Sequence, residues 1–184
     1  FNLEDWKNYT NEHFQKLDID VKDSIYDIGC GSGAFVYPLY LENHKVGGID
    51  YSYVLIDLAN TVMKESDFVN MEASKIDINK KYDIVVSHSV FHYFKDLDYA
   101  KNVVNKMIDK ANHKIGIFDI NDKSKEAAYH KTRMGKMNKE EYEKKYAGLE
   151  HLFYEKSWFE NLAKELGLKI TIFDQTFENY SNSS

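Results

Sequence analysis

Short apolar runs alternate with stretches of helical periodicity along most of the chain. The runs that predict buried strands span residues 24–29, 45–50, 67–71, 82–89, 113–120 and 168–174. The stretches that predict helices span about 33–43, 52–64, 96–111 and 157–166. Within 96–111, apolar residues recur at steps of three and four and form one face of a helix. Strands that alternate with helices predict an α/β domain, in which a doubly wound, mainly parallel sheet is covered by helices on both faces.

Two segments lie outside this alternation. Residues 1–20 predict an amphipathic helix, which we expect to cap the domain. Residues 121–156 are rich in lysine and glutamate and predict a lid-like helical insertion between the fifth and sixth strands. Because the 184 residues contain no repeat, low-complexity tract or linker, residues 1–184 are predicted to form a single domain.

Charge and composition narrow the class of protein. The net charge of −6 disfavours nucleic acid as a partner, because proteins that bind nucleic acids usually present a basic face. The single cysteine, Cys30, cannot form an internal disulfide, which fits a reducing, cytoplasmic location. No apolar run approaches the roughly 18 residues that a membrane span needs. The 24 basic residues include one arginine, Arg133, and this lysine bias is typical of an AT-rich genome.

The stretch "SIYDIGCGSGAF" places three glycines within five positions, directly after a predicted strand. Glycine destabilises regular elements, so this cluster indicates a tight turn or a close approach of backbone to a ligand. A dinucleotide site prefers G-x-G-x-x-G, whereas Gly29, Gly31 and Gly33 are spaced G-x-G-x-G. Asp27, just before the glycines, would repel a pyrophosphate but suits a ligand that carries an ammonium or sulfonium charge.

The motifs resemble those of the class I S-adenosylmethionine-dependent methyltransferases. "DIGCGSG" is similar to the family's first motif and "VGGIDYS" to its second, which ends in Asp50. "FVNMEAS" resembles the third-strand motif and "YDIVVSHSVFHYF" the fourth, so the likeness is densest over 24–94. The resemblance implies a Rossmann-like fold and S-adenosylmethionine as cofactor. It also implies a seventh, antiparallel strand between the fifth and sixth, which we expect beyond the polar residues that end at Ser184.

The resemblance also implies roles for individual residues. The methionine half of the cofactor would be held by Asp27, Gly29, Cys30, Gly31 and Gly33. The ribose would be held by Asp50, followed by Tyr51 and Ser52, and the adenine by Glu72 and Ala73, although aspartate is commoner than glutamate there. Ser87, at the end of the fourth strand, would lie beside the glycine loop.

A methyl acceptor that is an alcohol or amine needs a base, and the fourth strand ends in a candidate. His88 would lie near the reactive methyl and is predicted to be the catalytic base, although it could instead cap the next helix or bind the cofactor. His92, one helical turn on, is expected to pack. No metal site is predicted because the two histidines lack the H-E-x-x-H pattern, although acids near Asp119 leave a metal open.

The substrate class follows from what the motifs lack. The fourth strand does not end in the N-P-P-Y type motif of enzymes that methylate bases or protein amides. Cys30, the only thiol, lies in the glycine loop, which argues against covalent methylation of cytosine. We therefore predict transfer to an oxygen or nitrogen of a small polar metabolite, anionic or sugar-like. "YHKTR", 129–133, is either an anion clamp or a solvated helix face. The rival functions are an NAD-dependent oxidoreductase and a non-catalytic cofactor-binding domain.

Overall fold

The protein is described by a computed structural model, which covers residues 2–148 and 150–177. The strands are β1 (Ile25–Ile28), β2 (Val46–Asp50), β3 (Asp67–Asn70), β4 (Tyr82–His88) and β5 (Ala111–Phe118). The helices are α1 (Leu3–Leu17), α2 (Tyr37–Leu41), α3 (Tyr53–Val62), α4 (Leu97–Lys110), α5 (Glu126–Met134), α6 (Lys139–Tyr146) and α7 (Lys156–Glu165). Short 3₁₀ turns are η1 (Ala73–Lys75), η2 (Phe91–Tyr93) and η3 (Lys123–Lys125).

All five strands are parallel, in the order β3-β2-β1-β4-β5. β1 pairs with β2 on one side and with β4 on the other, so the direction in which the chain builds the sheet reverses at β1. In sheets of this kind, ligands bind at the carboxyl ends of the strands where the order reverses. The fold therefore places the candidate site where β1 and β4 end.

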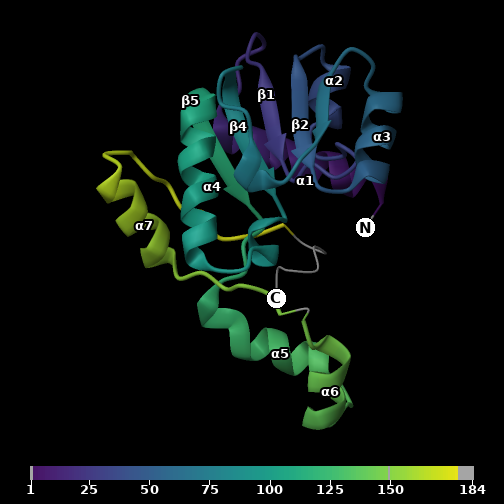
Figure 1. Cartoon of the computed structure of the whole chain (residues 1–184), viewed down its shortest axis with the longest axis vertical. Helices are drawn as coiled ribbons and strands as arrows, with labels where there is room; N and C mark the ends of the chain where they lie inside the picture. The colour runs from purple at the N-terminus through teal and green to yellow at the C-terminus, as the bar shows by residue number, and fades with distance from the viewer. Residues whose placement is uncertain (1, 149, 178–184) are drawn as a thin grey trace.

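Helices cover both faces of the sheet (Figure 1). Ile25 of β1 and Ile84 of β4 pack in one apolar core together with side chains of α1, α2 and α3. The next residues along these strands, Tyr26 and Val85, belong to a second core with α4 and α7. Side chains of successive strand residues point to opposite faces, so both faces of each central strand are buried. The predicted Rossmann-like α/β fold is confirmed.

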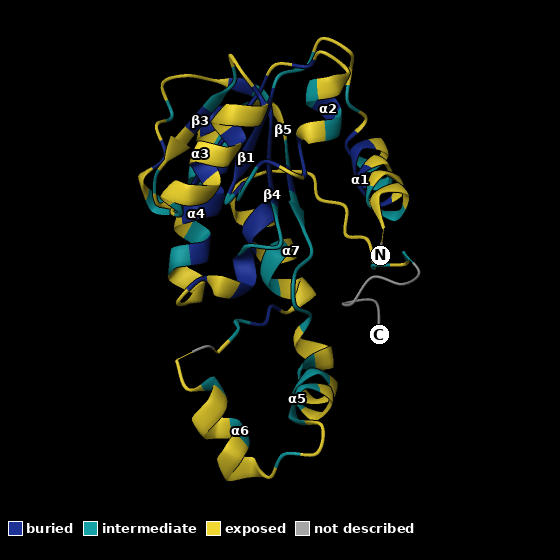
Figure 2. Cartoon of the chain, turned by 90° about the vertical axis from the view of Figure 1, so that its right-hand side faces the viewer, coloured by how far each residue is buried: buried dark blue, intermediate teal, exposed yellow. Residues whose placement is uncertain are grey.

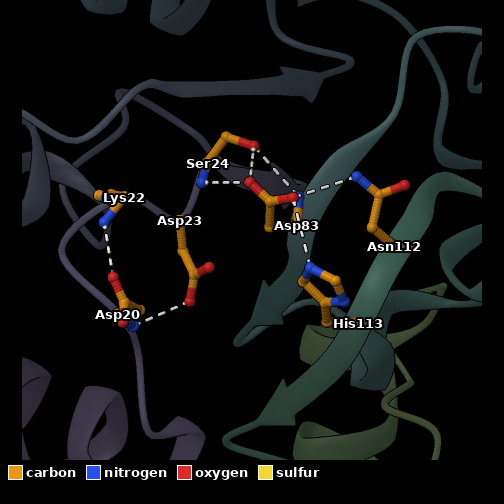
Figure 3. A network of polar contacts seen from close by, with 7 residues as sticks. All are labelled: Asp20, Lys22, Asp23, Ser24, Asp83, Asn112 and His113. Carbon is orange, nitrogen blue, oxygen red and sulfur yellow. Dashed lines mark hydrogen bonds and ion pairs between the residues drawn. The ribbon is translucent and has the colours of Figure 1, made fainter.

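A polar network fastens the amino-terminal ends of the central strands, opposite the candidate site (Figure 3). The carboxylate of Asp83 accepts hydrogen bonds from the backbone nitrogen and hydroxyl of Ser24, at 2.9 and 2.7 Å. It also accepts one from Asn112 at 3.1 Å, and His113 lies 3.7 Å away. These hydrogen bonds lower the pKa of Asp83 to about 2. One carboxylate thus joins β4 to the starts of β1 and β5.

The first helix is set by its cap and its apolar face. The side chain of Asn2 accepts hydrogen bonds from the backbone of Glu4 and Asp5, while Asp5 bonds back to the cap, which forms a capping box. Tyr9, His13 and Leu17 are buried at four-residue steps and therefore share one face of the helix. That face packs over α2 and the ends of the central strands.

The helix expected over 33–43 is much shorter than predicted, because α2 spans only Tyr37–Leu41. Pro38 has no N–H with which to bond the carbonyl of Ala34, so residues 34–36 form turns instead of a regular helix. The indole Nε1 of Trp6, from α1, donates to that carbonyl at 3.1 Å. The amino-terminal helix thus supplies a hydrogen bond that the second helix cannot make.

The sixth strand predicted over 168–174 does not form. These residues follow α7 and are exposed, including the apolar side chains Ile170, Ile172 and Phe173. A parallel or antiparallel strand needs a partner for its backbone groups, and no described strand lies beside this segment. The sheet therefore ends at β5 over the described residues, and the expected seventh strand lies outside them.

Residues 121–156 are helical, as the composition predicts, and form η3, α5 and α6. α5 and α6 project from the carboxyl ends of the strands and are mostly exposed (Figure 2). Whether this segment acts as a lid and residues 1–20 as a cap stays a prediction. Within 2–148 and 150–177 there is no helix with the length and apolar character required to traverse a bilayer.

Candidate active site

The three glycines form a tight turn between β1 and α2, and all three have a left-handed backbone. Their φ angles are 76° at Gly29, 54° at Gly31 and 78° at Gly33, which side chains rarely tolerate. A Cβ atom at Gly29 would lie 2.4 Å from Val90, and one at Gly33 would lie 2.2 Å from Met63. At Gly31 the nearest atom would be 3.8 Å away. Gly29 and Gly33 therefore serve packing, whereas a Cβ at Gly31 would make only an ordinary contact with Leu55.

Asp27 is a buried carboxylate with an unused oxygen. It is 1% exposed, and its Oδ1 has no hydrogen-bond partner among the described residues. Burial, followed by the nearby charge of Asp50, raises the pKa of Asp27 to about 8. Buried polar atoms without partners are uncommon and costly, so an unused carboxylate oxygen at a strand end indicates a place for a cationic donor.

Asp50, at the end of β2, holds the glycine turn in place. Its Oδ2 accepts a hydrogen bond from the backbone nitrogen of Gly31 at 2.9 Å, and its Oδ1 accepts one from that of Ser52 at 2.8 Å. Each carboxylate oxygen has a second acceptor position, so the side chain could still bind a pair of hydroxyls. Asp50 thus has a structural role that the sequence did not reveal.

The residues predicted to lie near the ribose and adenine are more exposed than Asp27 and Asp50. Glu72 is exposed, and its Oε1 accepts hydrogen bonds from Ser74 at 2.8 Å and from Tyr99 at 2.9 Å. Ala73 begins η1, and Tyr51 is 85% exposed. These three residues lie after β2 and β3, next to Asp50 in the sheet, but the structure shows no contact that joins them to Asp27.

Ser87 and Cys30 have partners within the protein. Ser87 is fully buried and its hydroxyl donates to the carbonyl of Ile28 at 2.8 Å, so its donor ties β4 to β1. The Cys30 thiol is buried and lies 3.5 Å from the carbonyl of Gly31. Burial raises the pKa of Cys30, so the thiol stays protonated and is a poor nucleophile.

His88 lies in an aromatic cage at the end of β4. Its ring stacks on Phe35 with the centroids 4.5 Å apart, and its Nε2 lies 2.7 Å from the Tyr9 hydroxyl. The Trp6 ring approaches edge-on at 5.9 Å. Burial is the main cause that lowers the pKa of His88 to about 4, so the ring is neutral near pH 7. The α1 contacts were not foreseen, because nothing local in the sequence pairs residue 9 with residue 88.

The sequence also matches a known protein family. A family model described as "Methyltransferase domain" matches residues 19–175, which is most of the chain. This chain belongs to that methyltransferase family. The resemblance to class I methyltransferases stated from the motifs is thereby confirmed.

Named relatives and solved structures are similar to this methyltransferase over part of its length. A malonyl-[acyl-carrier protein] O-methyltransferase of Acetivibrio thermocellus is 31% identical over 109 residues, which are 55% of this chain and 37% of that protein. A ubiquinone biosynthesis O-methyltransferase of Rickettsia conorii is 27% identical over 105 residues, 54% of this chain and 34% of the relative. The matches thus span little more than a third of these relatives.

The fold also matches solved methyltransferase structures. The magnesium protoporphyrin IX methyltransferase of Synechocystis PCC 6803, solved with bound SAH, superposes with a TM-score of 0.67 at 16% identity. That match covers 95% of this methyltransferase and 77% of the other chain. The plantazolicin methyltransferase in complex with SAH gives 0.60 at 21% identity, over 89% of this chain and 61% of that one. At these identities the likeness shows the fold.

A second histidine of the methyltransferase, His92, packs in the interior and has a ring nitrogen without a hydrogen-bond partner within the described part of the chain. His92 is 4% exposed, and its Nδ1 has no hydrogen-bond partner among the described residues. Burial lowers its pKa, while a hydrogen bond to the backbone of Asp119 opposes that shift. Since Nδ1 has no partner, this bond uses Nε2, which leaves Nδ1 with a lone pair. His92 was expected only to pack, and its contact with Asp119 could not be read from the sequence.

The acids after β5 do not gather into a metal site. The Asp122 carboxylate accepts hydrogen bonds from the backbone and the hydroxyl of Ser124, which caps η3. Across the part of the chain that the structure describes, no three His, Cys, Asp or Glu side chains are grouped so as to hold a metal ion. Two residues that follow strands have a left-handed backbone, Ser89 after β4 with a φ of 58° and Asp119 after β5 with a φ of 54°. The backbone is therefore strained at the ends of both strands.

Proposed function

We propose that this methyltransferase binds S-adenosylmethionine at the carboxyl ends of β1 and β2 and transfers its methyl group to an oxygen or nitrogen of a small molecule. The observation that carries the proposal is the buried, unpartnered Oδ1 of Asp27, two residues before the glycine turn begins. A carboxylate in that position matches the ammonium group of the cofactor's methionine half. Membership of the methyltransferase family supports the same cofactor.

Three residues would hold the cofactor. Asp27 would accept a hydrogen bond from the ammonium group, and Gly31 would let the backbone approach the aminocarboxypropyl chain. Asp50 would take the two ribose hydroxyls with the acceptor positions that its bonds to the turn leave free. When bound, the cofactor supplies a methyl group on a positively charged sulfur, which is a good leaving group.

The chain's own task is mainly to orient and to accept a proton. Holding the acceptor in line with the methyl and the sulfur can contribute about 7–11 kcal/mol to the lowering of the barrier. His88 is the proposed base, and its neutral ring at pH 7 has a lone pair for a proton. The Tyr9 hydroxyl can donate to Nε2 or accept from it, and if Nε2–H donates to Tyr9, the lone pair for the proton is on Nδ1. His92, with its unpartnered Nδ1, is the second candidate.

The two rival functions predict different ligands. An oxidoreductase would place a pyrophosphate at the glycine turn, next to the buried Asp27, and that negative charge would further oppose ionisation of the carboxyl instead of pairing with it. A non-catalytic domain would bind the cofactor but show no turnover. The family match favours neither rival.

Calorimetry with S-adenosylhomocysteine and with NADH tests the cofactor assignment. We expect the wild type to bind S-adenosylhomocysteine and not NADH. Asp27→Asn should weaken binding of S-adenosylhomocysteine about tenfold or more, because a charge-assisted hydrogen bond is lost. Asp57→Asn, an exposed acid on α3, is the matched control and should bind as the wild type does. Binding of NADH instead of S-adenosylhomocysteine would refute the proposal.

The methyl acceptor is found by its label. Incubation of the protein with a metabolite extract and methyl-labelled S-adenosylmethionine should label one small compound, and we expect it to be polar. We also propose that the protein works in the cytoplasm on its own substrate, without nucleic acid as partner, since the chain is acidic and carries one cysteine. Label that appears only in nucleic acid or protein would contradict the small-molecule assignment.

A further inference from the structure

The hairpin of α5 and α6 encloses a cavity of about 330 Å³, which is within the size range of small-molecule sites. Arg133 and His130 of α5 form one wall, and Tyr142 and Tyr146 of α6 form the other. His151, on the strand-like return from α6, completes the lining. The cavity is thus built almost entirely from the segment that the sequence marked as an insertion.

Arg133 is held in place by aromatic side chains. Its guanidinium carbon lies 4.0 Å from the centre of the Tyr146 ring and 5.5 Å from that of Tyr129. One of its terminal nitrogens also donates to the Tyr129 hydroxyl. Stacking of this kind fixes the plane of the guanidinium and leaves most of its five N–H donors directed elsewhere.

Arg133 has no ionic partner within the described part of the chain. No described carboxylate lies within ion-pair distance of it, and its contacts are tyrosines, which are neutral. Glu143 and Glu150 also line the cavity, but Glu143 pairs with Lys139 at 3.7 Å and Glu150 accepts the backbone nitrogen of Gly148 at 3.1 Å. The guanidinium of Arg133 thus has no ionic partner among the described residues, and neither of the two carboxylates in the lining is paired with it.

The choice of arginine at this position carries information. The chain has 24 basic residues and only one arginine. Wherever a surface needs only a positive charge, this sequence uses lysine. A guanidinium differs from an ammonium in that it is planar and binds a carboxylate through two parallel hydrogen bonds. An arginine in a lysine-rich chain therefore points to a need for that geometry at Arg133.

The cavity is connected to the carboxyl end of β4. The Tyr129 hydroxyl lies 2.9 Å from Nδ1 of His151, and the His151 ring lies 4.8 Å from that of His92. The backbone nitrogen of Leu152 donates to the carbonyl of His92 at 2.9 Å. Burial, followed by His92, Arg133 and His130, lowers the pKa of His151 to about 4, as expected beside an unneutralised cation.

We propose that the α5–α6 cavity binds a carboxylate group of the methyl acceptor through Arg133. The proposal rests on the proposed function for the identity of the ligand, since α5 and α6 project from the carboxyl ends of the strands, where the candidate site lies. Tyr142 and Tyr146 line the cavity together with Arg133, and their rings suit a flat, apolar body attached to the carboxylate. The structure thereby assigns a chemical class, a planar organic carboxylate, to the acceptor.

Benzoate is the probe for the test, with benzamide as its uncharged analogue. Ligand-detected NMR titration of the full chain should show millimolar benzoate binding and benzamide binding that is at least about tenfold weaker. Arg133→Met should weaken benzoate binding about tenfold or more, and Arg133→Lys, which keeps the charge, should still weaken it several-fold. Lys131→Met, an exposed neighbour on α5 that does not line the cavity, should bind as the wild type.

Several results would overturn the proposal. They are equal binding of benzoate and benzamide, no binding of benzoate, and unchanged binding of benzoate by Arg133→Met. Tighter binding of phenyl phosphate than of benzoate would overturn the carboxylate assignment in favour of a phosphate. If Arg133→Met changes thermal unfolding, the affinity of Arg133→Lys for benzoate is the deciding measurement. Titration of S-adenosylhomocysteine into the same samples separates the two proposals, because a failure to bind it counts against the proposed function and leaves the benzoate result standing.

Discussion

The hydroxyl of Tyr9 lies 2.7 Å from Nε2 of His88, and this contact joins the first helix to the end of β4. If His88 is the base, His88→Asn should lower turnover by about 10²–10⁴-fold and leave affinity for S-adenosylhomocysteine within a few-fold. Tyr9→Phe should lower turnover much less, because the base remains while its orientation loosens. Steady-state kinetics with the identified acceptor measures both. A parallel loss of cofactor affinity in His88→Asn would instead make His88 a binding residue.

The pH profile of His88 differs from that of a free histidine. Only the neutral ring accepts a proton, and the folded protein lowers the pKa of His88 to about 4. We therefore expect kcat/KM to stay level above about pH 5 as far as His88 is concerned, and not to rise through pH 6.5 as a solvated histidine would require. A rise centred below pH 6.5 that persists in His88→Asn but vanishes in His92→Asn would identify His92 as the base, because burial also lowers the pKa of His92.

Affinity for the cofactor should depend on pH through Asp27. In the free protein the pKa of Asp27 is raised to about 8, so the carboxyl is mostly protonated at pH 7. An ammonium group selects the ionised form, so binding should strengthen from pH 6 to pH 8, by up to about tenfold per unit. Calorimetry in buffers of different ionisation enthalpy should also detect proton release. Asp27→Asn should abolish both effects, and a wild type with pH-independent affinity would contradict this role.

Asp50→Ala should lower both cofactor affinity and stability. Removal of the carboxylate takes away the proposed ribose acceptor, and it also strips Gly31 and Ser52 of the acceptor for their backbone N–H groups. A buried donor left without a partner costs about 1–3 kcal/mol. Urea unfolding and calorimetry with S-adenosylhomocysteine measure the two losses. An unchanged affinity in a folded Asp50→Ala protein would reject Asp50 as a cofactor residue.

Two glycines of the turn should respond in opposite ways to alanine. Gly31→Ala adds a methyl group that meets only Leu55, at 3.8 Å, so the expected result is a clear loss of cofactor affinity with a stability loss of about 1 kcal/mol for the left-handed backbone. Gly33→Ala places that methyl group against Met63, so the larger loss should be in thermal stability. Thermal unfolding and cofactor titration of the pair check this, and equal behaviour of both variants would contradict it.

Asp83 should matter for stability and not for activity. The folded protein lowers its pKa to about 2, below the unfolded value of about 3.8, so its contribution is present above pH 4 and is lost as the pH falls toward 2. Asp83→Ala should lower the free energy of unfolding at pH 7 by about 1–3 kcal/mol, since Ser24 and Asn112 lose their acceptor. Asp98→Ala, at an exposed position of α4, is the control. Equal unfolding of both variants would disprove the role.

The sequence predicted the elements whose stability is local and missed those that depend on distant partners. The central strands β1, β2 and β4 carry apolar runs that are buried on both faces, so their positions were clear. Residues 168–174 have a similar run, but a strand also needs a neighbour to pair with, and no pattern within the segment reports one. The shortening of α2 could have been foreseen from Pro38, since proline removes a helical hydrogen bond.

The candidate site divides in the same way. Motif spacing located Asp27 and the glycine turn, because residues after one strand stay together in any fold of this type. It could not show that Ser87 donates to Ile28, or that His88 loses its ordinary pKa within an aromatic cage. Those properties arise from contacts between residues that are far apart in the chain.

The hydrogen bond from Trp6 to the carbonyl of Ala34 makes the first helix part of the glycine turn. A helix at the start of the sequence thus bonds to the backbone of the turn at which the cofactor is proposed to bind. By reciprocity of coupled equilibria, any ligand that orders the turn also strengthens the attachment of α1, and any force that detaches α1 weakens the hold on that ligand. The attachment of α1 and the affinity for a ligand at the turn are then thermodynamically coupled, and the indole nitrogen of Trp6 contributes to that coupling.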